Sequence, residues 1–183
     1  MGTHSLDTYP GDAYTPLLEF MYNSIAPLFE LPDSNINHEI NYYADWNLVG
    51  LPLDVDDATY TNLFPESIEG TLYSFNGGYI PEINLNYGEG YWLRFFEAGS
   101  TTITGVSINE ITISLSEGWN LISGISIPTS VSDIYDPDGI IIPSTFYGFT
   151  PDGYSNTEMI EPGKSYWIKA ISGGTIIISN SQD

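Results

Sequence analysis

The aromatic side chains carry most of the binding chemistry in this chain. Its 183 residues include 14 tyrosines, 8 phenylalanines and 4 tryptophans. An exposed aromatic ring offers a flat apolar face with a polar tip, which suits the ring of a sugar. Tyr79 and Tyr154 each follow a glycine in a predicted turn, where exposure comes easily. They are therefore candidate ligand-binding residues, with packing inside the turn as the simpler interpretation.

The four tryptophans are Trp46, Trp92, Trp119 and Trp167. Sugar stacking is one interpretation of them. We favour the other, burial in a core, because repeated units reuse the same large side chains inside.

Cations are rare: Arg94, Lys164 and Lys169 are the whole basic inventory, against 24 acidic residues. Arg94 and Lys169 each stand two residues after a tryptophan, so a strand would place each cation on the same face as that ring. A cation–π or carboxylate pair is the favoured interpretation. The functional alternative, which makes both candidate ligand-binding residues, is an anchor for an acidic glycan or a partner's carboxylate.

Carboxylates cluster at two places, and alternate oxygens on a loop are the ligands that calcium prefers. The candidate metal ligands are Asp54, Asp56, Asp57, Asp136 and Asp138. Calcium is thus the one cofactor that the residues suggest. We favour helix caps and solvated turns for these aspartates, because no EF-hand pattern is present.

Catalytic signals are absent from the sequence. The two histidines are His4 and His38, no Gly-x-Ser-x-Gly or phosphate-binding loop occurs, and cysteine is missing. The many carboxylates leave a glycosidase pair open without indicating one. We predict that the protein is not an enzyme. The net charge of −21 also disfavours nucleic acid and anionic membranes as partners.

The elements that must position these residues are strands. Residues 111–117 alternate apolar and polar at period two, and residues 175–179 are β-branched. Residues 1–35 differ: Thr15-Pro16 begins a predicted short helix. This arm could pack on the main body, remain from an upstream domain, or dock on a neighbouring subunit. No apolar run reaches the about 18 residues of a membrane span.

An internal repeat is the strongest feature of the chain. Matching segments recur in the same order roughly 73 to 75 residues apart. The pairs are Trp46-Asn47-Leu48 with Trp119-Asn120-Leu121, Leu72-Tyr73-Ser74-Phe75 with Phe146-Tyr147-Gly148-Phe149, and Gly88-Glu89-Gly90-Tyr91-Trp92 with Gly163-Lys164-Ser165-Tyr166-Trp167.

The repeat predicts the organisation of the fold. We expect an arm with a short helix at 1–35, β-repeats at 36–105 and 106–180, and a tail at 181–183. The class is all-β, with two pseudo-symmetric repeats in a sandwich or barrel-like structure. Packed around a pseudo-two-fold axis, the repeats would bury a common core, but the sequence leaves open whether they share one core or only touch. Gly88 and Gly163 stand where a tight turn needs a positive φ.

The second copy, from Gly118 to Ala170, resembles a repeat found near the C-termini of secreted and cell-surface proteins of bacteria and archaea. Its motifs are Gly-Trp-Asn-Leu-Ile-Ser and Glu-Pro-Gly-Lys-x-Tyr-Trp-Ile-Lys-Ala. The first copy departs from it at Asp45 and at Gly88-Glu89-Gly90. The resemblance implies an extracellular β-module and brings no catalytic site with it.

Three functions follow as hypotheses. The first is a non-catalytic structural or adhesive accessory module of a larger surface protein, here a segment without its signal peptide. The second is a carbohydrate-binding module that uses exposed tyrosines. The third is a virion or appendage protein whose residues 1–35 dock on the next subunit. A glycan or a surface protein is the expected partner.

Overall fold

The structure is a computed structural model that describes residues 35–180. The predicted N-terminal helix and the tail lie outside the described residues. Each repeat is a run of short strands with one helical turn. The first contains β1 (Ile36–Tyr42), β2 (Asp45–Gly50), β3 (Leu53–Asp54), α2 (Tyr60–Leu63), β4 (Tyr73–Phe75), β5 (Tyr79–Pro81), β6 (Gly90–Phe95) and β7 (Gly99–Ser107). The second contains β8 (Glu110–Leu115), β9 (Gly118–Ser123), β10 (Thr129–Ser130), η2 (Val131–Asp133), β11 (Tyr147–Thr150), β12 (Gly153–Asn156), β13 (Met159–Ile160), β14 (Ser165–Ala170) and β15 (Gly174–Ser179).

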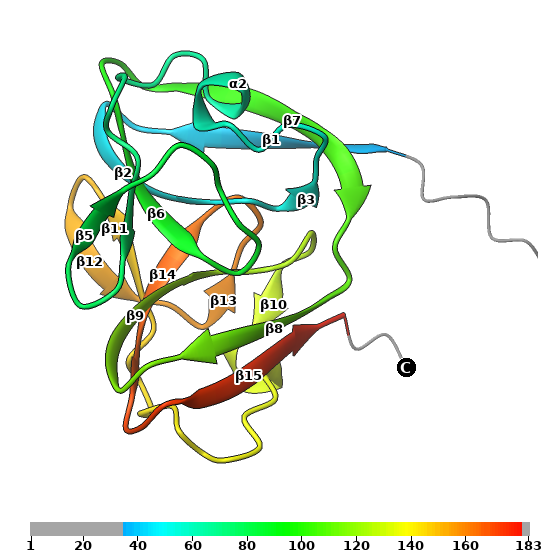
Figure 1. The fold of residues 1–183 in the computed structure, drawn as a ribbon, viewed down its shortest axis with the longest axis vertical. Helices are drawn as coiled ribbons and strands as arrows, with labels where there is room; N and C mark the ends of the chain where they lie inside the picture. Colours follow the sequence, from blue (N-terminus) through cyan, green and yellow to red (C-terminus); the bar gives the residue numbers. More distant parts are fainter. Residues whose placement is uncertain (1–34, 181–183) are drawn as a thin grey trace, which may run out of the picture. The chain divides into compact units, whose positions relative to one another are not determined.

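The two repeats build the same four-stranded antiparallel sheet. Its order is β2-β6-β4-β5 in the first repeat and β9-β14-β11-β12 in the second. A second layer is formed by β1-β7-β3 in one repeat and by β8-β15 in the other. The predicted all-β class is confirmed, and among the described residues the layers are sandwich-like, with no sheet closed into a barrel. In Figure 1, β1, β3 and β7 lie above β8 and β15, and β5, β11 and β12 share one side.

Alternation along the central strands divides their side chains between two environments. On β6, Tyr91, Leu93 and Phe95 enter the core of the first repeat, which also holds Phe64 and Ile103. The intervening Trp92 belongs to a separate cluster, as period two requires. The same division occurs on β14 around Trp167.

The described residues therefore contain two repeat cores and a third cluster between them, which answers the question that the sequence left open. Each repeat fills the space between its own two layers with aliphatic and aromatic side chains. The third cluster, made mainly of rings, joins the repeats: Leu48, Trp92, Leu121 and Trp167 are buried in it, with Trp46, Tyr73, Phe75, Tyr147 and Phe149 packed against them.

Turn geometry repeats as well. Gly88 and Gly163 both have φ +75°, which confirms the predicted positive φ. Asp45 has φ 71° where the second repeat has Gly118 at φ 94°. A carboxylate thus stands in a conformation that favours glycine, at the point where the first copy departs from the repeat motif. No helix in the described part of the chain is long and apolar enough to cross a membrane.

Candidate ligand-binding site

One face of each four-stranded sheet is paved with aromatic rings. In the second repeat, Trp119 and Lys169 are cross-strand partners, and Trp167 pairs with Tyr147 on the next strand. Tyr147 and Phe149 stand two residues apart on β11, so both point to this face. Phe149 is in turn the cross-strand partner of Tyr154. Strand alternation alone brings these side chains together within each repeat.

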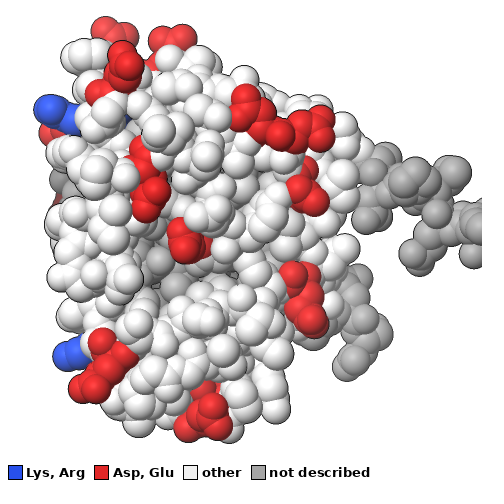
Figure 2. All heavy atoms as spheres, viewed as in Figure 1, with Lys and Arg blue, Asp and Glu red and all other residues white. Residues whose placement is uncertain are grey.

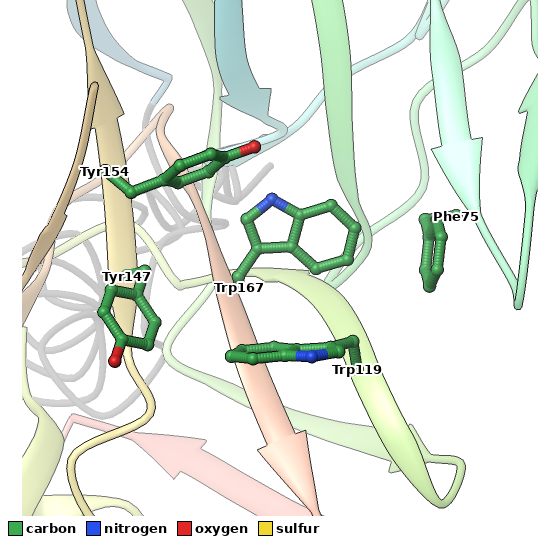
Figure 3. Close-up of a pocket in the computed structure, with 5 residues that line it drawn as sticks. All are labelled: Phe75, Trp119, Tyr147, Tyr154 and Trp167. Atoms are coloured by element: carbon green, nitrogen blue, oxygen red, sulfur yellow. The ribbon is translucent and has the colours of Figure 1, made fainter. Parts of the chain in front are cut away.

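These faces form two open pockets. The second-repeat pocket has a volume of about 380 Å³ and is lined by Phe75, Trp119, Tyr147, Tyr154 and Trp167. The first-repeat pocket has a volume of about 440 Å³ and is lined by Trp46, Tyr73, Tyr79, Trp92 and Phe149. Position by position the two linings are the same set of repeat-equivalent residues. Figure 3 shows the second-repeat pocket, with Trp119 below Trp167, Tyr154 above it and Phe75 opposite.

Each pocket takes one wall from the other repeat. Phe75, from the first repeat, lies edge-on to Trp167 with ring centroids 4.8 Å apart and planes at 77°. Phe149, from the second repeat, lies in the same way against Trp92, at 4.8 Å and 76°. Edge-to-face pairs at this separation are attractive. Neither pocket is complete within a single repeat.

Two of the tryptophans that line the pockets have buried indole N–H groups. Trp92 and Trp167 are buried, at 8% and 9% exposure, and neither indole nitrogen has a hydrogen-bond partner among the described residues. In Figure 3 the indole nitrogen of Trp167 faces Tyr154. A buried donor without a partner costs free energy. Both nitrogens are closed off from solvent, so the surface that the pockets offer to a ligand is almost wholly apolar.

The rims of the pockets carry the two predicted cations. The Arg94 guanidinium lies 5.8 Å from the centre of the Trp46 ring, and the Lys169 ammonium lies 5.7 Å from that of Trp119. Arg94 also forms a salt bridge with Asp45, Nε to Oδ1 at 2.6 Å. Lys169 has no salt bridge within residues 35–180. On the face shown in Figure 2, the visible basic side chains lie at two places along the left edge, whereas acidic side chains are spread over the face.

The predicted tyrosines stand beside these rings. Tyr79 is 58% exposed and Tyr154 is 56% exposed, and each lines the pocket of its own repeat. Tyr154 also reaches the other pocket, since its ring lies 6.5 Å from that of Trp92. Burial is the main cause that raises the pKa of Tyr154, and the nearby Tyr79 raises it further, whereas the adjacent Trp167 side chain lowers it. The structure thus brings Tyr79, Tyr154, Arg94 and Lys169 together on one aromatic surface.

The interpretation of the tryptophans as core residues holds only in part. Trp92 and Trp167 are buried, but Trp119 is 42% exposed, and all four line the pockets. Sequence reasoning also missed Phe75 and Phe149 as pocket walls. The signal that could have found them was already present, because each ring recurs in both copies of the repeat on the face that carries the tryptophans.

The predicted metal ligands lie apart from the pockets. The hydroxyl of Tyr87 donates to Asp54, and Asp57 accepts the Thr59 N–H at 2.9 Å. Hydrogen bonds from the Thr59 side chain and then from its backbone N–H lower the pKa of Asp57. Thr59, not Asp57, is the N-cap of α2, so the expected capping residue was displaced by two positions.

In the second acidic segment, Asp136 accepts the N–H groups of Ile140 and Ile141 at 3.0 and 2.9 Å. Its two carboxylate oxygens therefore already hold a turn. Within the described residues no three acidic or histidine side chains are placed to hold a metal ion. Calcium binding at Asp54, Asp56, Asp57, Asp136 and Asp138 stays a prediction.

No family model, curated protein or solved structure matches the chain significantly. A β-sandwich serves many functions, so the fold by itself does not identify the function of this chain. The fold and the site together define an all-β protein of two repeats with paired aromatic pockets.

Proposed function

We propose that the chain is a non-catalytic carbohydrate-binding module, an adhesive accessory part of a larger extracellular protein. The observation that carries the proposal is that both repeats form the same open pocket with five aromatic walls. A packing role would bury these rings. Instead, Trp119, Tyr79 and Tyr154 each leave about half of their surface in solvent.

The chemistry of the walls favours a neutral sugar ring. The C–H face of a pyranose packs on aromatic rings, and the exposed Tyr79 and Tyr154 add phenol hydroxyls that can hydrogen-bond to its hydroxyl groups. A cationic ligand suits the pockets less well, because Arg94 and Lys169 already cover the outer tryptophans. The base of a nucleotide also stacks on aromatic rings, but the net charge of −21 repels the phosphates of a nucleotide or nucleic acid.

The placement outside the cell rests on the resemblance to repeats of secreted and surface proteins. The predicted structural and adhesive role is compatible with glycan binding, since an accessory module adheres through such a site. The docking-arm hypothesis depends on residues 1–35, of which 1–34 lie outside the described residues, so it stays a prediction.

The test is a titration of soluble cello-, chito-, xylo- and manno-oligosaccharides, followed by tryptophan fluorescence and calorimetry. The variants are Trp46→Ala, Trp119→Ala and the double substitution. Tyr135→Ala is the control, because Tyr135 is 61% exposed and lines neither pocket. Loss of one stacked ring weakens affinity by about tenfold to a hundredfold at the altered pocket.

We expect the double variant to lose binding while the control keeps it. The proposal fails if no oligosaccharide in the series binds, or if the double variant, folded by near-UV circular dichroism, binds like the parent protein.

A further inference from the structure

We infer that the two pockets bind a glycan with opposite directions of its chain, so that the module binds two glycan chains and cross-links them. This inference rests on the proposed function. It goes beyond it by stating how many chains are bound and in which relative direction.

The two repeats are related by a pseudo-two-fold axis. The N–H of Gly50 donates to the carbonyl of Gly163 at 3.1 Å, and the N–H of Ser123 donates to the carbonyl of Gly88 at 3.0 Å. The donors Gly50 and Ser123 are equivalent positions of the two repeats, and so are the acceptors Gly163 and Gly88. Each bond is therefore the counterpart of the other with the repeats exchanged. Such reciprocal contacts define an isologous interface, the kind that a two-fold axis generates.

Side chains repeat this exchange. Gly88 packs against Ile113 of the second repeat, and Gly163 packs against Ile40, the equivalent residue of the first. The ring pairs Phe75–Trp167 and Phe149–Trp92 are exchanged in the same way and have the same centroid distance of 4.8 Å. The symmetry therefore extends from the backbone to the pocket walls.

Contacts between equivalent residues give the position of the axis, because a residue that touches its own equivalent must lie next to the axis. Gly90 and Ser165 are equivalent, and a Cβ on Gly90 would lie 2.6 Å from the Cβ of Ser165. Gly50 and Ser123 are equivalent too, and their Cβ positions would overlap. The axis thus passes between the central strands β2, β6, β9 and β14, beneath the aromatic surface.

The outer end of the axis lies between the pockets. Tyr79 and Tyr154 are equivalent residues, both more than half exposed, and they are close enough for Tyr79 to affect the titration of Tyr154. Their rings connect across the boundary, since Tyr79 packs on Phe75 at 5.6 Å and Tyr154 packs on Phe149 at 5.1 Å. The axis therefore leaves the protein at this surface, with one pocket on each side.

The two-fold axis determines in which direction each pocket accepts a glycan chain, because a rotation of 180° reverses every direction perpendicular to its axis. A glycan lying on this surface is perpendicular to the axis, and it has a reducing and a non-reducing end. If it fits one pocket in one direction, the other pocket accepts the opposite direction. One straight chain therefore cannot satisfy both sites, whereas two antiparallel chains can.

The experiment compares a short and a long form of the oligosaccharide that binds in the titrations above. The full chain is titrated by calorimetry with the disaccharide and with the polymer, and light scattering follows cross-linking of the polymer. We expect two disaccharides per chain, no large affinity gain for the polymer, and scattering that rises and then disperses at excess protein. Trp46→Ala and Trp119→Ala each keep one site and abolish the scattering, while Tyr135→Ala keeps it.

The inference is overturned if one polymer chain occupies both sites of one protein, which would raise affinity by about a hundredfold or more over the disaccharide. One disaccharide per chain would overturn it as well. These results differ from failure of the proposed function, in which no disaccharide binds at all. Light scattering by the protein without glycan gives the baseline for self-association.

Discussion

Gly163 lies at the contact between the two repeats, and substituting it tests the interface on which both pockets depend. It has φ +75°, and a Cβ at this position would overlap the Cδ1 of Ile40 and lie 2.9 Å from its Cγ1. Gly77 is a matched control in the first repeat. Its φ is +70°, and no atom lies within 4 Å of where its Cβ would be.

The two substitutions separate backbone strain from packing. Gly77→Ala adds only the strain of a left-handed alanine, about 1–2 kcal/mol. Gly163→Ala adds similar strain and also overpacks a closed interface, which costs about 1–3 kcal/mol more. The free energy of unfolding therefore falls by about 2–5 kcal/mol for Gly163→Ala. At this chain length, each kcal/mol lowers the melting temperature by about 2–4 °C.

Urea unfolding of both variants measures the difference, with unchanged m-values as the sign that both remain two-state. Ile40→Val removes the Cδ1 that the new methyl group meets, so the pair Gly163→Ala with Ile40→Val should lose less stability than the sum of the single changes. Equal losses for Gly163→Ala and Gly77→Ala, or an additive double variant, would show that the contact with Ile40 does not constrain Gly163.

Two further predictions concern a buried phenol and a rim carboxylate. Burial raises the pKa of Tyr166 to about 12, so the unfolded chain ionises first, near pH 10. The contribution of Tyr166 to the free energy of unfolding is constant below pH 10 and falls by about 1.4 kcal/mol per pH unit from pH 10 to 12. Other tyrosines with a raised pKa add to the fall, so Tyr166→Phe should reduce the slope in urea titrations by about that amount, and an unchanged slope would exclude this role of Tyr166. Asp45→Gly removes an exposed ion pair with Arg94 but relieves a positive φ, so unfolding free energy should change by less than about 1 kcal/mol. A thermal melt showing a larger loss would make that ion pair structural.

Local patterns in the sequence determined the strands and their faces. The repeat of about 74 residues required two equivalent units. The glycines at 88 and 163 required positive φ because the same turn recurs. The spacing of two residues placed Arg94 with Trp92 and Lys169 with Trp167, since strands alternate. All of these inferences need only neighbours along one strand or turn.

Only the tertiary structure decided what covers the aromatic faces. Period two shows that Trp119, Trp167 and Tyr147 share a face, but this pattern is the same for a buried core and for an open pocket. The outcome depends on Phe75, which comes from the other repeat and covers Trp167 but leaves Trp119 partly in solvent. For the same reason only the structure decided whether the repeats share a core. Each repeat has two layers that fill its own core, and the remaining aromatic face meets its equivalent across the axis in a separate ring cluster.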